Sequence, residues 1–386
     1  MQDNAVTKYF YQGFPNDSIT LLFGESQLYQ LELTYNLANP TVSSTDTEIA
    51  LPPETAYQHV TLDTLTPAPK NMVLDKDGNW LAIYPLKSQE NKVVKAKLYL
   101  TVYPHPFQKL PIVPSKALLS QIKYWEANSA IVSSLAEKLK TPLNFYNYLT
   151  ENFSYAYDRV GVGAERLGAE RALANPEDAI CTEFTDTFIA LARSAGVSAR
   201  EVNGYAHTTN SSLKPLGLET DVLHSWPEYY DENQETWVAI DPTWGKTTGG
   251  IDYFNKMDFS HLAFVIHGQE SSYPYPAGAY KKDLNEKTIA VTLADTKVED
   301  HQSYSLEDDK DGSYIVNTGN VALIDYKVGL DSGKTITIKY LPPYGREQIQ
   351  KDSILAKAPS LPIIPIVVSV LAVSLILFYV VSRRKK

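Results

Sequence analysis

The sequence predicts an α+β protein with a central mixed segment, a β-module on either side of it, and one membrane-spanning helix at the C-terminal end. Residues 28–37 and 95–103 alternate apolar and polar side chains, which is typical of half-buried strands. The residues that follow Cys181 instead place apolar side chains at helical spacing. Residues 358–382 carry no charge, and about 20 such residues span a bilayer as a helix.

The N-terminal β-module is expected at residues 1–112. The dipeptide Asp77-Gly78 lies between two apolar dipeptides and indicates a hairpin turn. The acidic run around it lacks the later ligands of a calcium loop, so a turn is the better interpretation. Four prolines between residues 104 and 114 mark the end of this module. Several short strands with turn residues between them favour a sandwich-like arrangement.

The central domain is expected at residues 113–270 and opens with a helical stretch at 116–140. Further strands at its C-terminal side predict a second β-module over residues 280–345. These strands are 288–293, 314–316, 322–328 and 335–340. The alternative is that they extend the central domain.

Cys181 is the only cysteine of the chain, so no intrachain disulfide can form. A lone cysteine is more often a small buried apolar residue than a nucleophile. Here a predicted helix starts at the cysteine and ends at Gly196, with Phe184 and Phe188 on its apolar face. The N–H groups and positive dipole end of a helix N-terminus stabilise a thiolate and can hold an oxyanion.

His224 and Asp241 are the expected partners of this thiol. Residues 225–230 and 236–240 read as two strands of a hairpin. If Glu232-Asn233 forms the centre of the turn, His224 and Asp241 lie directly opposite each other, with Cβ atoms about 4.5–5.5 Å apart. A thiol, an imidazole and a carboxylate are the groups that nucleophilic catalysis requires.

Other polar residues compete with these three. His207 is a rival base, expected in a solvated loop, and Asp221 and Asp252 are alternative carboxylates. His261 and His267 lie in an apolar stretch and are expected to be structural histidines. No spacing of His, Cys and carboxylates predicts a metal site, and no cofactor is expected.

The run C-x-x-F, L-A-R-x-x-G-V-x-A-R-x-V-x-G-Y, H-S-W and D-P-T resembles the core of the transglutaminase-like superfamily. The resemblance covers residues 140–250. It implies a papain-like fold with Cys181 as nucleophile, His224 as base and Asp241 as the residue that orients the base. The sequence departs from the family at Ala179, where glycine is frequent, and at Pro227, which follows H-S-W.

The function that follows from this resemblance is acyl transfer, or hydrolysis of an amide or peptide bond, through a thioester on Cys181. The expected substrate is a protein or peptide. Water as the acceptor makes the protein a cysteine protease or deamidase, and a lysine amine makes it a cross-linking transglutaminase. The alternative is a catalytically silent binding or structural protein that keeps the fold.

The C-terminal segment predicts a single-pass plasma-membrane protein. Residues 361–381 are nearly all apolar, and residues 382–386 end in R-R-K-K, which the positive-inside rule assigns to the cytoplasm. The catalytic domain is then extracellular, which requires an export signal that residues 1–4 do not provide. We expect a signal missing from this sequence; the alternative, a cytosolic tail-anchored protein, violates the charge rule. The net charge of −10 argues against nucleic acid as a partner.

Overall fold

The structure is a computed structural model that describes residues 24–349. It has short gaps at 162–163, 284–285 and 331–332, and within 209–222 only residues 210, 212 and 214 are described. The predicted membrane helix at 361–381 and the tail at 382–386 lie outside the described residues. Within the part that is described, no helix is both long and apolar enough to span a bilayer.

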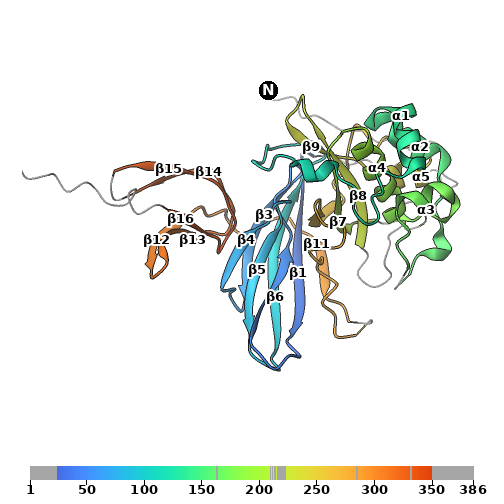
Figure 1. Cartoon of the computed structure of the whole chain (residues 1–386). Helices are drawn as coiled ribbons and strands as arrows, with labels where there is room; N and C mark the ends of the chain where they lie inside the picture. The colour runs from blue at the N-terminus through green and yellow to red at the C-terminus, as the bar shows by residue number, and fades with distance from the viewer. Residues whose placement is uncertain are drawn as a thin grey trace, which may run out of the picture.

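The central domain contains an antiparallel sheet in the order β10-β7-β8-β9. The helices gather beside this sheet, and α4 packs against β8 and β7 (Figure 1). Large aromatic and aliphatic side chains of α2, α4 and the sheet are fully buried between them and form its hydrophobic core. The strands are β7 (Ala199–Ala206), β8 (Leu223–Asp231), β9 (Thr236–Ala239) and β10 (His261–His267), and the helices are α1 (Ala130–Leu139), α2 (Pro142–Asn152), α3 (Ala169–Ala174), α4 (Cys181–Ser194) and α5 (Pro242–Thr247).

The predicted helical stretch at 116–140 is helical only at its ends, in a short 3-10 turn (Lys116–Leu119) and in α1. Between them Ile122 and Trp125 form an isolated bridge, and Tyr124 has a φ of 74°, which breaks a helix. The indole of Trp125 is fully buried, and its Nε1 donates to Asp186 at 2.8 Å. A tertiary contact therefore overrides the helical pattern here.

The N-terminal module is a sandwich of two antiparallel sheets, seen in blue in Figure 1. Its strands bury alternate side chains between the sheets, as the period-two pattern predicted. One sheet has the order β11-β1-β6-β3 and the other β2-β5-β4. Their bounds are β1 (Gln27–Ala38), β2 (Thr45–Leu51), β3 (Gln58–Thr66), β4 (Asn71–Leu74), β5 (Trp80–Leu86), β6 (Asn91–Val102) and β11 (Ile289–Leu293).

Strand β11 corrects the predicted division of the C-terminal part. It was expected in the module at 280–345, but it pairs antiparallel with β1, with Leu31 opposite Val291. Its half-buried Ile289 and Val291 pack against the N-terminal core. The remaining strands have a small core of their own around Ile315, Leu323 and Ile338. They are β12 (Tyr304–Asp309), β13 (Gly312–Asn317), β14 (Leu323–Gly329), β15 (Thr335–Leu341) and β16 (Arg346–Ile349).

Two side-chain amides join the N-terminal module to β10, the edge strand of the central sheet. Gln58 accepts the Ala263 N–H at 2.9 Å and donates to the Ala263 carbonyl at 3.1 Å. Asn79 does the same for Ile266, at 2.7 Å in both directions. Both amides are buried and take the hydrogen-bonding positions of a neighbouring strand. We call this pair of contacts the amide clamp.

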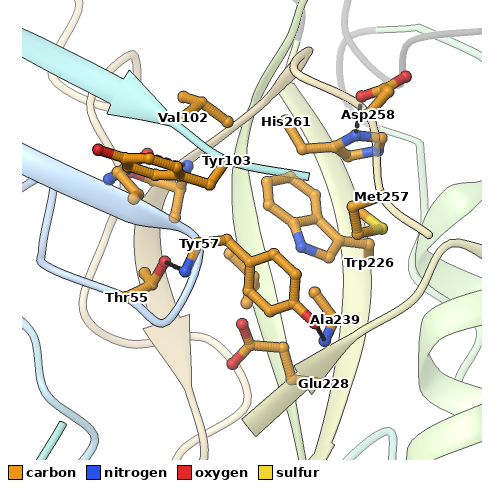
Figure 2. A pocket seen from close by; sticks show the side chains of 13 residues that line it. Thr55, Tyr57, Val102, Tyr103, Trp226, Glu228, Ala239, Met257, Asp258 and His261 are labelled. Carbon is orange, nitrogen blue, oxygen red and sulfur yellow. Dashed lines mark hydrogen bonds and ion pairs between the residues drawn. The ribbon is translucent and has the colours of Figure 1, made fainter. Parts of the chain in front are cut away.

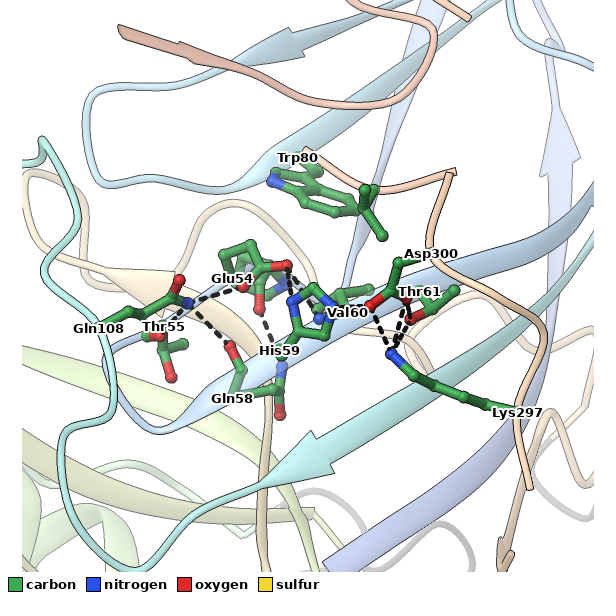
Figure 3. Close-up of polar contacts among 12 residues, drawn as sticks. Glu54, Thr55, Gln58, His59, Val60, Thr61, Trp80, Gln108, Lys297 and Asp300 are labelled. Atoms are coloured by element: carbon green, nitrogen blue, oxygen red, sulfur yellow. Dashed lines mark hydrogen bonds and ion pairs between the residues drawn. The ribbon is translucent and has the colours of Figure 1, made fainter. Parts of the chain in front are cut away.

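A polar cluster on β3 ties the N-terminal module to the segment that follows β11 (Figure 3). His59 Nδ1 lies 3.0 Å from Glu54 Oε1, and its Nε2 lies 3.1 Å from Asp300 Oδ2. Lys297 pairs with the same Asp300 carboxylate at 2.6 Å. Burial opposes the charged form of His59, but Glu54 and Asp300 outweigh it and raise the pKa of His59. The charged ring therefore bridges two carboxylates from distant parts of the chain.

Candidate active site

Cys181 is the first residue of α4, as the sequence predicted, and only 3% of it is exposed. The buried Glu183 fixes this first turn, because its carboxylate accepts the Ile180 N–H at 3.0 Å and the Leu167 N–H at 2.9 Å. Phe184 lies inside the core on the same helix. The thiol is thus held at a helix N-terminus, where unpaired backbone N–H groups and the helix dipole favour negative charge.

His224 and Asp241 form a buried pair with 2.9 Å between His224 Nε2 and Asp241 Oδ2. His224 lies near the start of β8. Asp241 is the N-cap of α5, where its Oδ1 accepts the Trp244 N–H at 3.0 Å. The ring of Trp244 stacks on the imidazole with centroids 5.1 Å apart. Both carboxylate oxygens of Asp241 therefore accept hydrogen bonds. The imidazole of His224 is held at its edge by Asp241 and against its face by Trp244.

The hairpin register that predicted this contact is wrong by two residues. Asp231 pairs with Thr236 and Glu228 pairs with Ala239, so the two residue numbers of each pair add up to 467. A turn centred on Glu232-Asn233 would give pairs that add up to 465. The turn is longer because Asp231 Oδ1 accepts the N–H groups of Asn233 and Gln234. A slip of two keeps every side chain on its face. Asp241 therefore still approaches His224, but from the start of α5 and not from a paired strand position.

The charges of this pair stabilise each other. Burial lowers the pKa of His224, but the charge and hydrogen bond of Asp241, and then the nearby Cys181, raise it to about 9. Burial raises the pKa of Asp241, but His224 and then His261 hold it well below its usual range. His224 Nδ1 is buried and has no hydrogen-bond partner among the described residues. That nitrogen is the one left for the Cys181 thiol.

His261 belongs to the same cluster, although the sequence predicted a structural histidine. Its Nε2 lies 3.1 Å from Asp241 Oδ2, and its Nδ1 lies 2.8 Å from Asp258 Oδ1. Lys214 Nζ pairs with the other oxygen of Asp258 at 3.0 Å. These four groups come from three separate segments of the chain, and only Asp258 and His261 are close in sequence.

His224, Asp241 and His261 are also the kind of side chains that bind metal ions, and their ligand atoms lie within 4.8 Å of one another. Sequence spacing predicted no such group, because the three come from different elements. The nitrogen–oxygen distances of 2.9 and 3.1 Å are those of hydrogen bonds. A proton on Nε2 of His224 and another on Nε2 of His261 account for the two contacts with Asp241. We therefore interpret the group as a proton-sharing cluster.

Tyr155 is a second residue that sequence reasoning missed. It forms a bridge with Ala179, two residues before the cysteine, and the next N–H, that of Ala156, donates to the Ala179 carbonyl at 2.8 Å. Tyr155 is 8% exposed, and its hydroxyl is buried without a partner in the described part of the chain. Burial and then the negative charge of Cys181 raise its pKa. A buried unpaired donor beside a nucleophile requires a functional explanation.

The rival residues lie elsewhere. His207 contacts the ring of Tyr29 in the N-terminal module, 6.4 Å between centroids. Asp252 caps a local turn by accepting the N–H groups of residues 254 and 255. Asp221 lies outside the described residues. His267 bonds to Glu201 and to the carbonyl of Pro274, as expected of a structural histidine.

Part of the chain is similar to known proteins. Residues 126–242 match the model of the transglutaminase-like superfamily. The uncharacterized protein YebA of Bacillus subtilis is 26% identical over 211 residues, which is 46% of this chain and 28% of YebA. This chain thus spans little more than a quarter of that relative.

Two similar solved structures are a candidate cysteine protease of Cytophaga hutchinsonii and the periplasmic domain of TgpA from Pseudomonas aeruginosa. The first has a TM-score of 0.42 and 14% identity, over 70% of this chain and 87% of the other. The second has a TM-score of 0.32 and 15% identity, over 59% of this chain and 92% of the other.

Proposed function

Residues 126–242 belong to the transglutaminase-like superfamily, and on that premise we propose that the protein is a cysteine enzyme that transfers or hydrolyses acyl groups. The substrate is an amide side chain or a peptide bond of a protein or peptide. The Cys181 sulfur attacks the carbonyl carbon while His224 takes the thiol proton. The C–N bond then breaks, the nitrogen leaves with that proton, and a thioester remains. Water or an amine then attacks the thioester and gives a proton to His224, the C–S bond breaks, and the Cys181 sulfur leaves and regains that proton.

The observation that carries this proposal is that one ring nitrogen of His224 is hydrogen-bonded and the other is free of a partner among the described residues. Its Nε2 is committed to Asp241 at 2.9 Å, and its buried Nδ1 has no partner in the described part of the chain. Cys181 also raises the pKa of His224, and this Nδ1 is the nitrogen available to its thiol. An imidazole oriented by a carboxylate through one nitrogen and open to a thiol through the other is a general base.

An oxyanion forms on the substrate carbonyl during each attack and needs donors. We propose the backbone N–H of Cys181, at the start of α4, as one of them. The hydroxyl of Tyr155 is the other. It is buried, unpartnered among the described residues and adjacent to the residues that lead into Cys181. Two donors aimed at one oxygen are the minimum that most acyl-transfer sites use.

The proposal is tested by alkylation with iodoacetamide at neutral pH, with the labelled site mapped by peptide mass spectrometry. Cys181 should react, and His224→Ala should slow the reaction by roughly tenfold or more, because the imidazolium no longer stabilises the thiolate. His267→Ala is the matched control, a buried histidine outside the site. Equal rates in wild type and His224→Ala would favour the silent binding protein.

The acyl acceptor is identified by incubating the enzyme with a glutamine-containing peptide, with and without a fluorescent primary amine. Ammonia release in both reactions with no label indicates deamidation, and label on the peptide indicates transamidation. Shortened peptides indicate a protease. Cys181→Ser must abolish whichever product appears, since a serine hydroxyl is a far weaker nucleophile beside the same base.

We also propose that the described part of the chain lies outside the cell, anchored by residues 361–381. The support is the charge-free segment followed by four basic residues at 383–386. Protease added to intact cells should remove epitopes placed in the N-terminal module. Full protection of those epitopes, with cleavage after lysis, contradicts this topology.

A further inference from the structure

We propose that His261 is a positioning residue that is charged at neutral pH, where it holds Asp241 in place and offsets the negative charge that Asp241 exerts on His224. This inference rests on the proposed function, because it assigns a role to a group behind the catalytic base. Figure 2 shows His261 with Asp258 at one side of the ring. His261 is the first residue of β10 and is buried.

The protonation of His261 follows from its two neighbours. Nε2 faces Asp241 at 3.1 Å and Nδ1 faces Asp258 at 2.8 Å. A neutral imidazole has one N–H and one lone pair, so it would place a lone pair against one of these carboxylates. Only the imidazolium donates to both. The charge of Asp258, together with the hydrogen bonds that His261 donates to both carboxylates, overcomes burial and raises the pKa of His261 to about 9.

The charges around this ring balance. Asp241 and Asp258 contribute two negative charges, and His261 and Lys214 contribute two positive charges. A buried charge is tolerated only when it is paired in this way. Removing the imidazolium therefore leaves Asp258 with Lys214 as its only cation of the cluster, and Asp241 with His224 as its only one. Asp241 is the one that His224 also contacts, through the same Oδ2 atom.

The effect on His224 has a definite sign. The groups that face His224 are Cys181 from α4, Asp241 at the start of α5, His261 from β10 and two tryptophan rings, and Tyr155 lies near Cys181. Among them His261 alone is a second cation, with ring centroids 5.7 Å apart. A nearby like charge disfavours the charged form, so His261 lowers the pKa of His224. Its loss raises that pKa further.

His261 acts through Asp241 and does not touch substrate. Its ring packs edge-on against Trp226, 4.9 Å between centroids, and against Trp244 at 4.5 Å. The hollow that it lines together with Tyr57, Met257 and Glu228 has a volume of about 20 Å³ (Figure 2). Roughly one water molecule fits in such a space. A substrate side chain therefore has no room beside His261.

The test replaces His261 by glutamine, whose amide can still donate to Asp241 but carries no charge. Above its pKa His224 has lost the proton that the leaving nitrogen takes up, and this loss gives the alkaline limb of the kcat/KM–pH profile. We expect this limb to move up by about one pH unit, with kcat lowered about 10- to 100-fold. The nitrogen-15 NMR titration of the His224 ring should shift in the same direction. His267→Gln is the matched control, because this ring is also buried, on the same strand, with both nitrogens bonded. It should destabilise the protein without moving the limb.

Asp258→Asn serves as a second variant if His261→Gln does not fold. It leaves the His261 ring in place and removes the carboxylate at Nδ1, so His261 should lose its charge at a lower pH. An unchanged His224 titration in folded His261→Gln, or a neutral His261 ring at pH 7 in wild type, overturns the inference. The NMR titration can be measured even in a protein that has no catalytic activity. A shifted titration in a protein without activity would leave this inference standing and remove the proposed function instead.

Discussion

Asp241→Asn should lower kcat by about four orders of magnitude while leaving the fold intact. The carboxylate now accepts from His224 Nε2 and His261 Nε2 through one oxygen. The amide presents N–H groups at that position, so both imidazoles must turn a lone pair toward it. His224 then carries its proton on Nδ1, the nitrogen proposed to serve the thiol, and can no longer act as a base.

The substitution is well suited to this question because asparagine is as good an N-cap as aspartate. The bond from the Trp244 N–H to residue 241 is therefore kept. Circular dichroism and thermal unfolding establish that the variant is folded, and steady-state kinetics give kcat. Asp252→Asn is the control, since that carboxylate only closes a local turn. Normal turnover in Asp241→Asn would show that another carboxylate orients the base.

Tyr155→Phe should lower kcat by about 10²- to 10³-fold with little change in KM, as expected for the loss of one oxyanion donor. The donor contributes in the transition state, when negative charge develops on the carbonyl oxygen, and much less in the ground state. The same change removes a buried hydroxyl that has no partner among the described residues. An unpaired buried polar group costs about 1–3 kcal/mol, so the variant should be at least as stable as wild type.

Tyr157→Phe is the matched control for this prediction. The ring of Tyr157 packs edge-on against Tyr155 with centroids 4.9 Å apart, but Tyr157 is 52% exposed and its hydroxyl donates to the carbonyl of Ser212. Its kcat should stay within a few-fold of wild type. Lower stability of Tyr155→Phe together with unchanged kcat would make Tyr155 a packing residue and leave the oxyanion with the backbone donor alone.

Local pattern was sufficient for the helix that begins at Cys181 and for the contact between His224 and Asp241. Helical spacing and a helix-ending glycine locate the first, since both depend on neighbours in sequence. The predicted contact between His224 and Asp241 is present in spite of the error in register. The turn is two residues longer than predicted, and side chains in a strand alternate with a period of two, so each side chain stays on its predicted face. An error of one residue would have separated the pair.

The roles of His261 and Tyr155 and the pairing of β11 could not be predicted in the same way. His261 reaches Asp241 only because β10 packs at the edge of the sheet, beyond β7. Tyr155 comes beside Cys181 through a single bridge to Ala179. Strand β11 pairs with β1 across more than 250 residues of chain. Each contact depends on the packing of distant segments, which leaves no periodic signal in the sequence.

The amide clamp has a consequence for how the chain can be divided. His261 stands two residues before Ala263, whose backbone is satisfied by Gln58, and Ile266 depends in the same way on Asn79. A fragment that starts after the proline boundary would expose the backbone of β10 as an open edge, a surface on which further copies can add strands. We therefore expect the central domain to need the module that precedes it. If such a fragment is insoluble, the cause is the missing N-terminal module, and the result does not contradict the proposed enzymatic function.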